Sequence, residues 1–310
     1  MGEASIAQRP RSATRDLRAG ARAIEVLCMS KISSNTWRFW AVAAALGLLG
    51  SYSSNLKAEP AASPWVEGYN NKARLLAGQT EAAAAPMAGI EIAMPAGWKT
   101  YWRSPGDAGG VPPTFDWAGS ENLASARVLF PAPHRLIDKS GPTLGYKDHV
   151  VLPVELTPKD PAKPMLLKLK TEYGVCKDIC VPAEANLQLE VTPDSGASPD
   201  ISGALALVPQ KAARAGTDPV LSKWSVEAAS GKPVLRLEVL DPGGTDGDAF
   251  VEAPDGLYVP VPKKLAGAGG KGIYEVDLSE GVDFKALKGQ NLTVTLTGAK
   301  GQSETVIKLD

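Results

Sequence analysis

The 310-residue sequence carries almost no net charge. Its 33 lysines and arginines nearly balance 34 aspartates and glutamates, which leaves a formal net charge of -1. Proteins that bind nucleic acid or an anionic surface usually present an excess of basic residues. The composition therefore gives no electrostatic reason to expect nucleic acid as a partner.

Long apolar runs are also absent after residue 60, whereas a membrane-spanning helix needs about 20 apolar residues. The one notable run, FWAVAAALGLLG at 39–50, has twelve residues. A basic segment ending at Arg38 precedes it, and a small-residue site at 56–58 follows it. This order is typical of a secretory signal peptide. We expect residues 1–58 to be an N-terminal extension and signal peptide, removed on export, with no stable membrane insertion afterwards.

Cysteine and histidine are scarce, with three and two copies. Cys28 lies in the segment that we expect to be removed, so the exported chain would retain only Cys176 and Cys180. Two cysteines in an exported protein favour a disulfide. The histidines are His134 and His149.

Glycine and proline, with 31 and 25 copies, separate many short apolar runs. This texture predicts an all-β protein. Several short strands at this spacing indicate a β-sandwich, which we place at residues 59–196. The predicted strands are 73–78, 88–94, 98–103, 112–117, 123–129, 150–156, 165–173 and 186–192.

The alternating pattern stops at residues 197–216, which we interpret as a linker with a short helix capped by Ser198 or Asp200. Alternation returns in VLRLEVL and LTVTLTG. Residues 217–310 are therefore predicted to form a second, smaller β-sandwich domain.

Cys176 and Cys180 are expected at the bend of a β-hairpin, where facing Cα atoms lie roughly 5 Å apart and a disulfide is feasible. A structural disulfide that closes so short a loop contributes only ~2 kcal/mol, against ~4 or more for a long loop. A redox pair instead needs one accessible sulfur and a second sulfur to resolve the mixed disulfide.

Two other interpretations of the cysteines are open. The thiolates could join His134 and His149 in a zinc or copper site, although no paired ligand spacing supports one. One thiolate could also act as a nucleophile beside a histidine. The residues alone leave all four interpretations standing.

Three segments resemble the N-terminal periplasmic domain of the thiol:disulfide interchange protein DsbD family, and the related ScsB-type reductases more closely. They are GWKTYWRSPGDAGGVPPTFDW at 97–117, GYKDHVVLPVEL at 145–156 and YGVCKDICVPAEANLQL at 173–189. The resemblance covers roughly residues 65 to 195. It implies an immunoglobulin-like β-sandwich that carries a redox-active cysteine pair on a hairpin.

Carried over from the family, Cys176 and Cys180 are the catalytic pair, and Cys180 forms the mixed disulfide with the partner. The family also shields its pair with a loop, which by position falls within residues 134–146. Leu144 and Tyr146 are its candidate shielding residues. The sequence departs from the DsbD pattern in having three residues between its cysteines instead of five.

The resemblance implies a periplasmic thiol–disulfide oxidoreductase of the protein-disulfide reductase type. It would relay electrons between thioredoxin-like periplasmic proteins and oxidised proteins, without a cofactor or metal. Because the family's membrane domain is missing here, we expect a separate membrane electron donor. The alternative is a periplasmic binding module, for a metal or a protein partner, whose disulfide is only structural.

Overall fold

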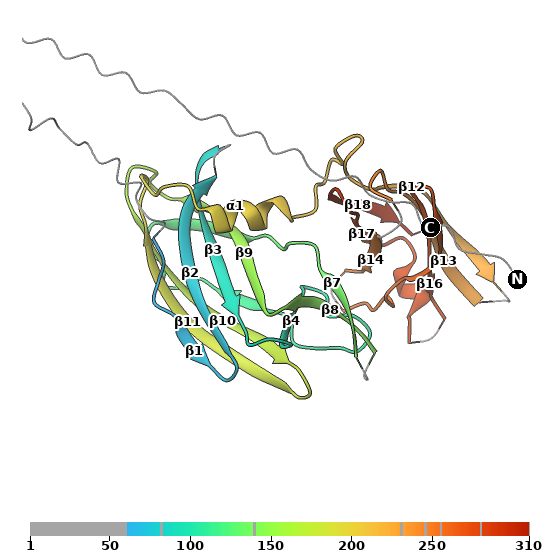
Figure 1. The fold of residues 1–310 in the computed structure, drawn as a ribbon, viewed down its shortest axis with the longest axis horizontal. Helices are drawn as coiled ribbons and strands as arrows, with labels where there is room; N and C mark the ends of the chain where they lie inside the picture. Colours follow the sequence, from blue (N-terminus) through green and yellow to red (C-terminus); the bar gives the residue numbers. More distant parts are fainter. Residues whose placement is uncertain are drawn as a thin grey trace, which may run out of the picture. The chain divides into compact units, whose positions relative to one another are not determined.

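The computed structural model describes residues 61–80, 83–138, 141–229, 232–244, 247–254, 256–279 and 281–309. The predicted signal peptide and Cys28 lie outside these residues. The described chain is almost entirely β-structure (Figure 1). No helix in these ranges combines the length and the apolar character needed to span a membrane.

The N-terminal half forms two antiparallel sheets. One has the order β1-β2-β3-β9-β6, and the other has the order β11-β10-β4-β8-β7, with β5 also paired to β10. The first sheet contains β1 (Val66–Gly68), β2 (Asn71–Thr80), β3 (Ala83–Ala93), β9 (His149–Pro158) and β6 (Leu123–Val128). The second contains β11 (Cys180–Val191), β10 (Met165–Cys176), β4 (Lys99–Tyr101), β8 (Gly141–Lys147), β7 (His134–Asp138) and β5 (Thr114–Asp116).

Alternation along the strands builds the core between these sheets. Leu75, Ile90 and Leu152 from the first sheet share one buried cluster with Leu167 and Leu187 from the second. Each side chain comes from the apolar face of its strand, as the period of two requires. All eight predicted runs overlap a strand of the structure, which confirms the all-β prediction.

Strands β7 and β8 were not predicted, because their sequence is rich in residues typical of turns. Gly145 explains why one such residue suits a strand here. A Cβ atom at this position would lie 2.0 Å from the carbonyl oxygen of Thr100, on the neighbouring strand β4. The glycine thus permits β4 and β8 to pair.

Helix α1 (Pro199–Ala206) begins at the N-cap Ser198, whose side chain accepts a hydrogen bond from the Ile201 amide. Ile201 and Ala204 pack against Leu76 and Val151, which point away from the main core. The segment predicted as a linker therefore also covers the outer face of the first sheet.

The C-terminal half forms two smaller sheets with the orders β12-β13-β16-β15 and β14-β17-β18. Their apolar faces enclose a second buried cluster, which includes Leu235, Val276 and Val294. The elements are β12 (Val220–Ala229), β13 (Lys232–Leu240), β14 (Asp248–Glu252), β15 (Lys263–Ala268), β16 (Lys271–Asp277), α2 (Phe284–Leu287), β17 (Asn291–Thr297) and β18 (Gln302–Lys308).

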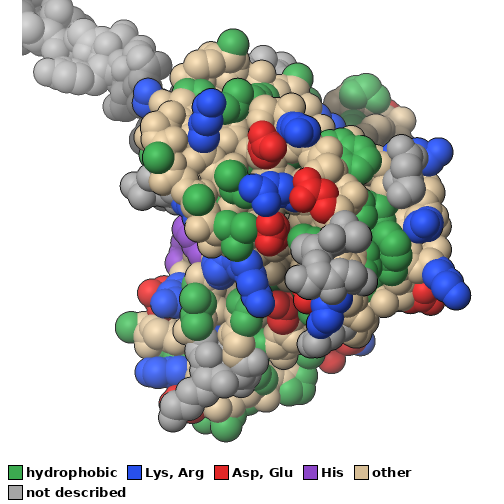
Figure 2. Space-filling view, turned by 90° about the vertical axis from the view of Figure 1, so that its right-hand side faces the viewer, with side chains coloured by type: hydrophobic (Ala, Val, Ile, Leu, Met, Phe, Trp, Pro, Cys, Tyr) green, Lys and Arg blue, Asp and Glu red, His purple; other side chains and the backbone are tan. Residues whose placement is uncertain are grey.

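Side chains from the C-terminal sheets also reach the N-terminal ones. Phe250 belongs to the first buried cluster, with its ring centroid 6.0 Å from that of Trp102. Arg103 donates hydrogen bonds to the carboxylates of Glu252 and Glu304. Apolar packing and ion pairs thus join the two halves beside β4. Figure 2 shows basic and acidic side chains interspersed on one face of the molecule.

Candidate redox site

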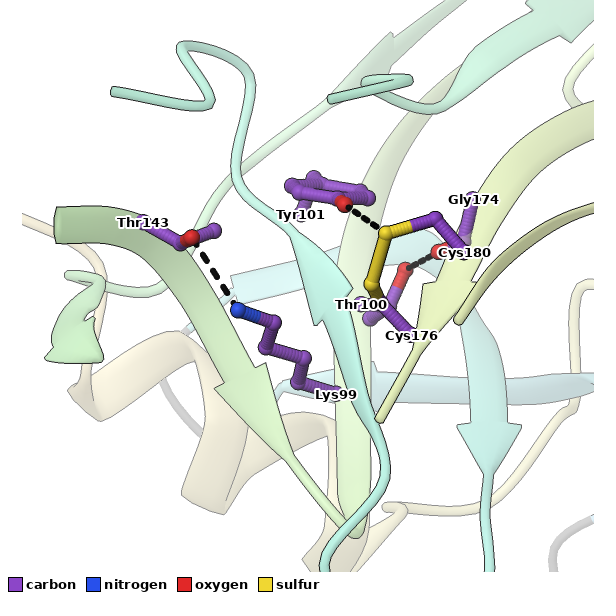
Figure 3. Close-up of a disulfide and its surroundings, with 7 residues drawn as sticks. All are labelled: Lys99, Thr100, Tyr101, Thr143, Gly174, Cys176 and Cys180. Atoms are coloured by element: carbon purple, nitrogen blue, oxygen red, sulfur yellow. Dashed lines mark hydrogen bonds between the residues drawn. A yellow bond between two sulfur atoms is a disulfide. The ribbon is translucent and has the colours of Figure 1, made fainter. Parts of the chain in front are cut away.

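The two cysteines lie at the tip of the β10–β11 hairpin and form a disulfide (Figure 3). The strands pair without a register shift from Met165 and Val191 up to Cys176 and Cys180, which face each other directly. The three loop residues are turned by a hydrogen bond from the Lys177 amide to the Ile179 carbonyl, 3.2 Å long. Strand pairing alone therefore brings the two cysteines together.

The two sulfurs differ in their surroundings. Cys176 is 4% exposed, because β10 is flanked by β11 on one side and by β4 on the other. Cys180 is exposed, at the start of the edge strand β11. An incoming thiolate can therefore approach Cys180 more readily than Cys176.

Tyr101 on β4 reaches the exposed cysteine. Its hydroxyl oxygen lies 3.2 Å from the Sγ atom of Cys180 (Figure 3). A disulfide sulfur has no proton, so the phenol is the donor in this state. The contact places a hydrogen-bond donor on the sulfur that is more open to attack.

Two glycines make room for the Tyr101 ring. A Cβ atom at Gly110 would lie 2.2 Å from ring atom Cε1, and one at Gly174 would lie 2.8 Å from Cε2. The ring thus passes between the backbone of the loop after β4 and the backbone of β10. Tyr101 itself is only 3% exposed.

Sequence reasoning did not assign Tyr101 to the site. Alternation correctly separates it from the core residue Trp102, but the WKTYW run is explained by packing alone. The signal that Tyr101 faces the disulfide is the register of β4 against β10, in which Lys99 pairs with Cys176. That register is not readable from the sequence.

Lys99 and Thr100 fix β4 beside the hairpin. The Nζ atom of Lys99 donates to Oγ1 of Thr143 at 3.0 Å, and Lys99 is 6% exposed. The hydroxyl of Thr100 donates to the carbonyl of Gly174 at 2.8 Å. Figure 3 shows both bonds flanking the strand that carries Tyr101. These bonds hold Tyr101 in register with the disulfide.

Leu144 and Tyr146, the predicted shielding residues, both belong to the buried cluster between the sheets. The hydroxyl of Tyr146 donates to the Pro131 carbonyl at 2.7 Å. Burial raises the pKa of Tyr146 well above its ordinary value, an effect that the charge of Arg103 opposes. Both residues serve the core here, and their role as a shield stays a prediction.

His134 and His149 line a cavity of about 660 Å³ whose wall includes Tyr146 and part of α1, and which neither cysteine lines. The Nε2 atom of His149 lies 2.9 Å from a carboxylate oxygen of Glu91. Among the residues that the structure describes, no three His, Cys, Asp or Glu side chains gather as a metal-binding group. The structure thus separates the histidines from the disulfide.

Residues 72–192 match the family model described as "Thiol:disulfide interchange protein DsbD, N-terminal". No curated protein matches the chain significantly.

A solved structure, the N-terminal periplasmic domain of ScsB from Proteus mirabilis, is similar with a TM-score of 0.62 at 21% sequence identity. The match covers 81% of this chain and 99% of that one. At this identity the likeness shows a shared fold, and it confirms the expected immunoglobulin-like β-sandwich. The family match includes both cysteines and Tyr101. The likeness to DsbD N-terminal domains therefore lies in residues 72–192 of this chain.

Proposed function

We propose that the protein is a periplasmic thiol–disulfide exchange module that relays electrons through Cys176 and Cys180. One observation carries the proposal: a disulfide at a hairpin tip joins a buried cysteine to an exposed one. This asymmetry suits exchange, which needs one sulfur open to the partner and one held back to resolve the mixed disulfide.

A purely structural role fits the same geometry less well. The twelve paired positions of β10 and β11 already bring Cys176 and Cys180 together. The loop that the disulfide closes is short, so in the chain-entropy model the bond stabilises the fold by only ~2 kcal/mol. A disulfide joining distant strands would have contributed more.

The exchange proceeds in two balanced steps. A thiolate of the partner attacks Sγ of Cys180, and the bond between Cys180 and Cys176 breaks. The electron pair of that bond leaves on Cys176 as a thiolate. A second thiolate of the partner then attacks the mixed disulfide and releases Cys180. In total, two electrons and two protons pass from the partner dithiol to this chain.

Tyr101 is the proposed catalytic aid for the second step. When Cys180 leaves as a thiolate, the phenol 3.2 Å away can donate a hydrogen bond to the developing charge. Hydrogen bonds to charged groups contribute more than neutral ones. The same bond would favour the thiolate when reduced Cys180 attacks an oxidised acceptor.

The proposed partners are thioredoxin-like periplasmic proteins, a separate membrane electron donor and oxidised periplasmic proteins. The family relationship supports a thioredoxin-like partner and the periplasmic location. Export is checked by cell fractionation: release of a chain beginning near residue 59 on osmotic shock supports it. Retention of residues 39–50 in the membrane fraction contradicts it.

The redox role is tested by titrating the purified protein against redox buffers. Structural disulfides typically have reduction potentials below about -300 mV, whereas thioredoxin lies at about -270 mV. We expect the Cys176–Cys180 pair to be reduced by a reduced thioredoxin-like protein, and to titrate above about -270 mV. A pair that stays oxidised under those conditions would be a structural staple, and the alternative of a binding module would replace the relay.

A further inference from the structure

The loop that follows β4 covers the outer face of Tyr101. Three backbone hydrogen bonds hold this loop, residues 104–113, against its own sandwich. The Gly174 amide donates to Val111, and the Leu144 and Ala108 amides bond to Pro105 and Pro142 respectively. Between these bonds, Gly110 presses its backbone on the Tyr101 ring.

A fourth connection comes from the C-terminal half of the chain. The Oδ1 atom of Asp107 accepts a hydrogen bond from the Tyr258 hydroxyl at 2.8 Å. The same atom accepts one from the Val261 amide, also at 2.8 Å. Tyr258 and Val261 lie between β14 and β15, so the C-terminal sheets hold the loop through one carboxylate.

Both donors are well suited to this task. Val261 is 6% exposed and packs in the buried cluster of the N-terminal sheets, which fixes its amide. Burial, with the hydrogen bond and charge of Asp107, raises the pKa of Tyr258 to about 12. The phenol therefore keeps its proton, and donates it, over the physiological pH range.

We propose that Asp107 is a positioning residue through which the C-terminal sandwich holds Tyr101 against Cys180. The path from Asp107 to Cys180 runs through direct contacts. Asp107 fixes the loop, Gly110 of the loop confines the Tyr101 ring, and the Tyr101 hydroxyl points at Sγ of Cys180. The effect on exchange rests on the proposed function. The anchor itself, which is the bonding of Asp107 to Tyr258 and Val261, can be measured without that function.

The first test is nitration of the oxidised full-length protein with tetranitromethane, followed by mass spectrometry of each tyrosine. Tyr101 is 3% exposed and is expected to react slowly. Asp107→Ala removes the shared acceptor, so we expect nitration of Tyr101 to rise about fivefold, the effect of losing an interaction of hydrogen-bond strength. Tyr69, at 62% exposure, serves as the reactive reference.

Matched variants separate the anchor from general loosening. Asp107→Asn keeps an acceptor oxygen and should leave Tyr101 within about twofold of the parent, because an uncharged acceptor forms the same bonds more weakly. Asp277→Ala removes a different carboxylate, one that accepts hydrogen bonds from Ser279, and should leave the nitration of Tyr101 unchanged. Tyr173, 1% exposed in the core, must stay unreactive.

The second test is a double-mutant cycle on the rate at which the reduced protein reacts with an oxidised thioredoxin-like protein. Tyr101→Phe should slow this step about threefold. In the parent, the hydrogen bond from Tyr101 increases the fraction of Cys180 present as thiolate, and the lower nucleophilicity of that thiolate offsets only part of this gain. Asp107→Ala should slow the step about twofold, since the donor is displaced and not removed. If Asp107 acts through Tyr101, the double variant is no slower than Tyr101→Phe.

Each outcome decides something. Unchanged Tyr101 nitration in Asp107→Ala overturns the anchor, whatever the exchange rates are. Independent, multiplying effects in the cycle overturn the path through Tyr101. If Tyr173 reacts as well, the fold of Asp107→Ala has loosened, and Tyr258→Phe is tested in its place. Faster nitration of Tyr101 but not of Tyr173 in that variant supports the anchor, and unchanged nitration of Tyr101 overturns it. Loss of exchange in every form, parent included, would instead remove the proposed redox function and leave the nitration result standing.

Discussion

Cys176→Ser is expected to form a stable covalent complex with a thioredoxin-like partner, linked through Cys180. The partner carries one reactive cysteine, activated as a mixed disulfide with thionitrobenzoate, and has its second cysteine replaced by serine. The exposed Cys180 thiolate displaces the coloured thionitrobenzoate anion and takes its place. Because neither chain retains a second thiol at the site, the new disulfide is not resolved. Non-reducing electrophoresis and the released colour measure the product.

Cys180→Ser should form this complex roughly a hundredfold more slowly, the penalty of a local opening that costs about 2.7 kcal/mol. Its remaining thiol, Cys176, is 4% exposed between two strands and cannot meet a folded partner without such an opening. The variant pair is its own control, because each member removes one sulfur from the same hairpin. The reverse pattern would exchange the roles of the two cysteines, and no complex with either would return the pair to a structural role.

The hairpin that carries the cysteines is predictable from the sequence because its determinants are local. The alternation of Leu187 and Leu189 gives the strand its buried face, and proximity in sequence makes Cys176 and Cys180 neighbours across a turn. The predicted strand at 165–173 was too short, since β10 continues to Cys176. The predicted strand ends before Gly174, because glycine weakens a strand pattern. Here it admits the Tyr101 ring.

The rest of the site depends on contacts between distant parts of the chain. Tyr101 and Cys180 are 79 positions apart, and Asp107 and Tyr258 are 151 apart. No periodicity or spacing reports which strand lies beside which, so the sequence alone explains Tyr101 by packing. The same limit applies to Phe250, which is predicted to belong to the second sandwich but packs with the first core. The sequence therefore predicts the position of the disulfide but not the residues that hold its surroundings.

Arg103→Ala is expected to cause a large loss of stability at the junction between the two halves. Arg103 follows β4 directly and donates to Glu252 and Glu304, whose side chains are only 15% and 18% exposed. Burial lowers the pKa of Arg103, but the hydrogen bonds and charges of the two glutamates outweigh this effect and raise it. Removing the guanidinium leaves two carboxylates close together and poorly solvated. We expect a cost of about 3 kcal/mol in the free energy of unfolding, measured by chemical denaturation.

Arg127→Ala supplies the matched control, because Arg127 also pairs with a glutamate, Glu155, but at 60% and 45% side-chain exposure. An exposed pair of this kind contributes at most about 0.5 kcal/mol, since water screens both charges. The free energy of unfolding of Arg103→Ala should therefore be well below that of Arg127→Ala. Adding Glu252→Gln to Arg103→Ala should recover part of the lost stability, because it removes one of the two unpaired charges. Because Arg103 lies two residues after Tyr101, Arg103→Ala should also show faster nitration of Tyr101 than Arg127→Ala. Equal stability of the two arginine variants would show that the Arg103 ion pairs contribute little to the junction.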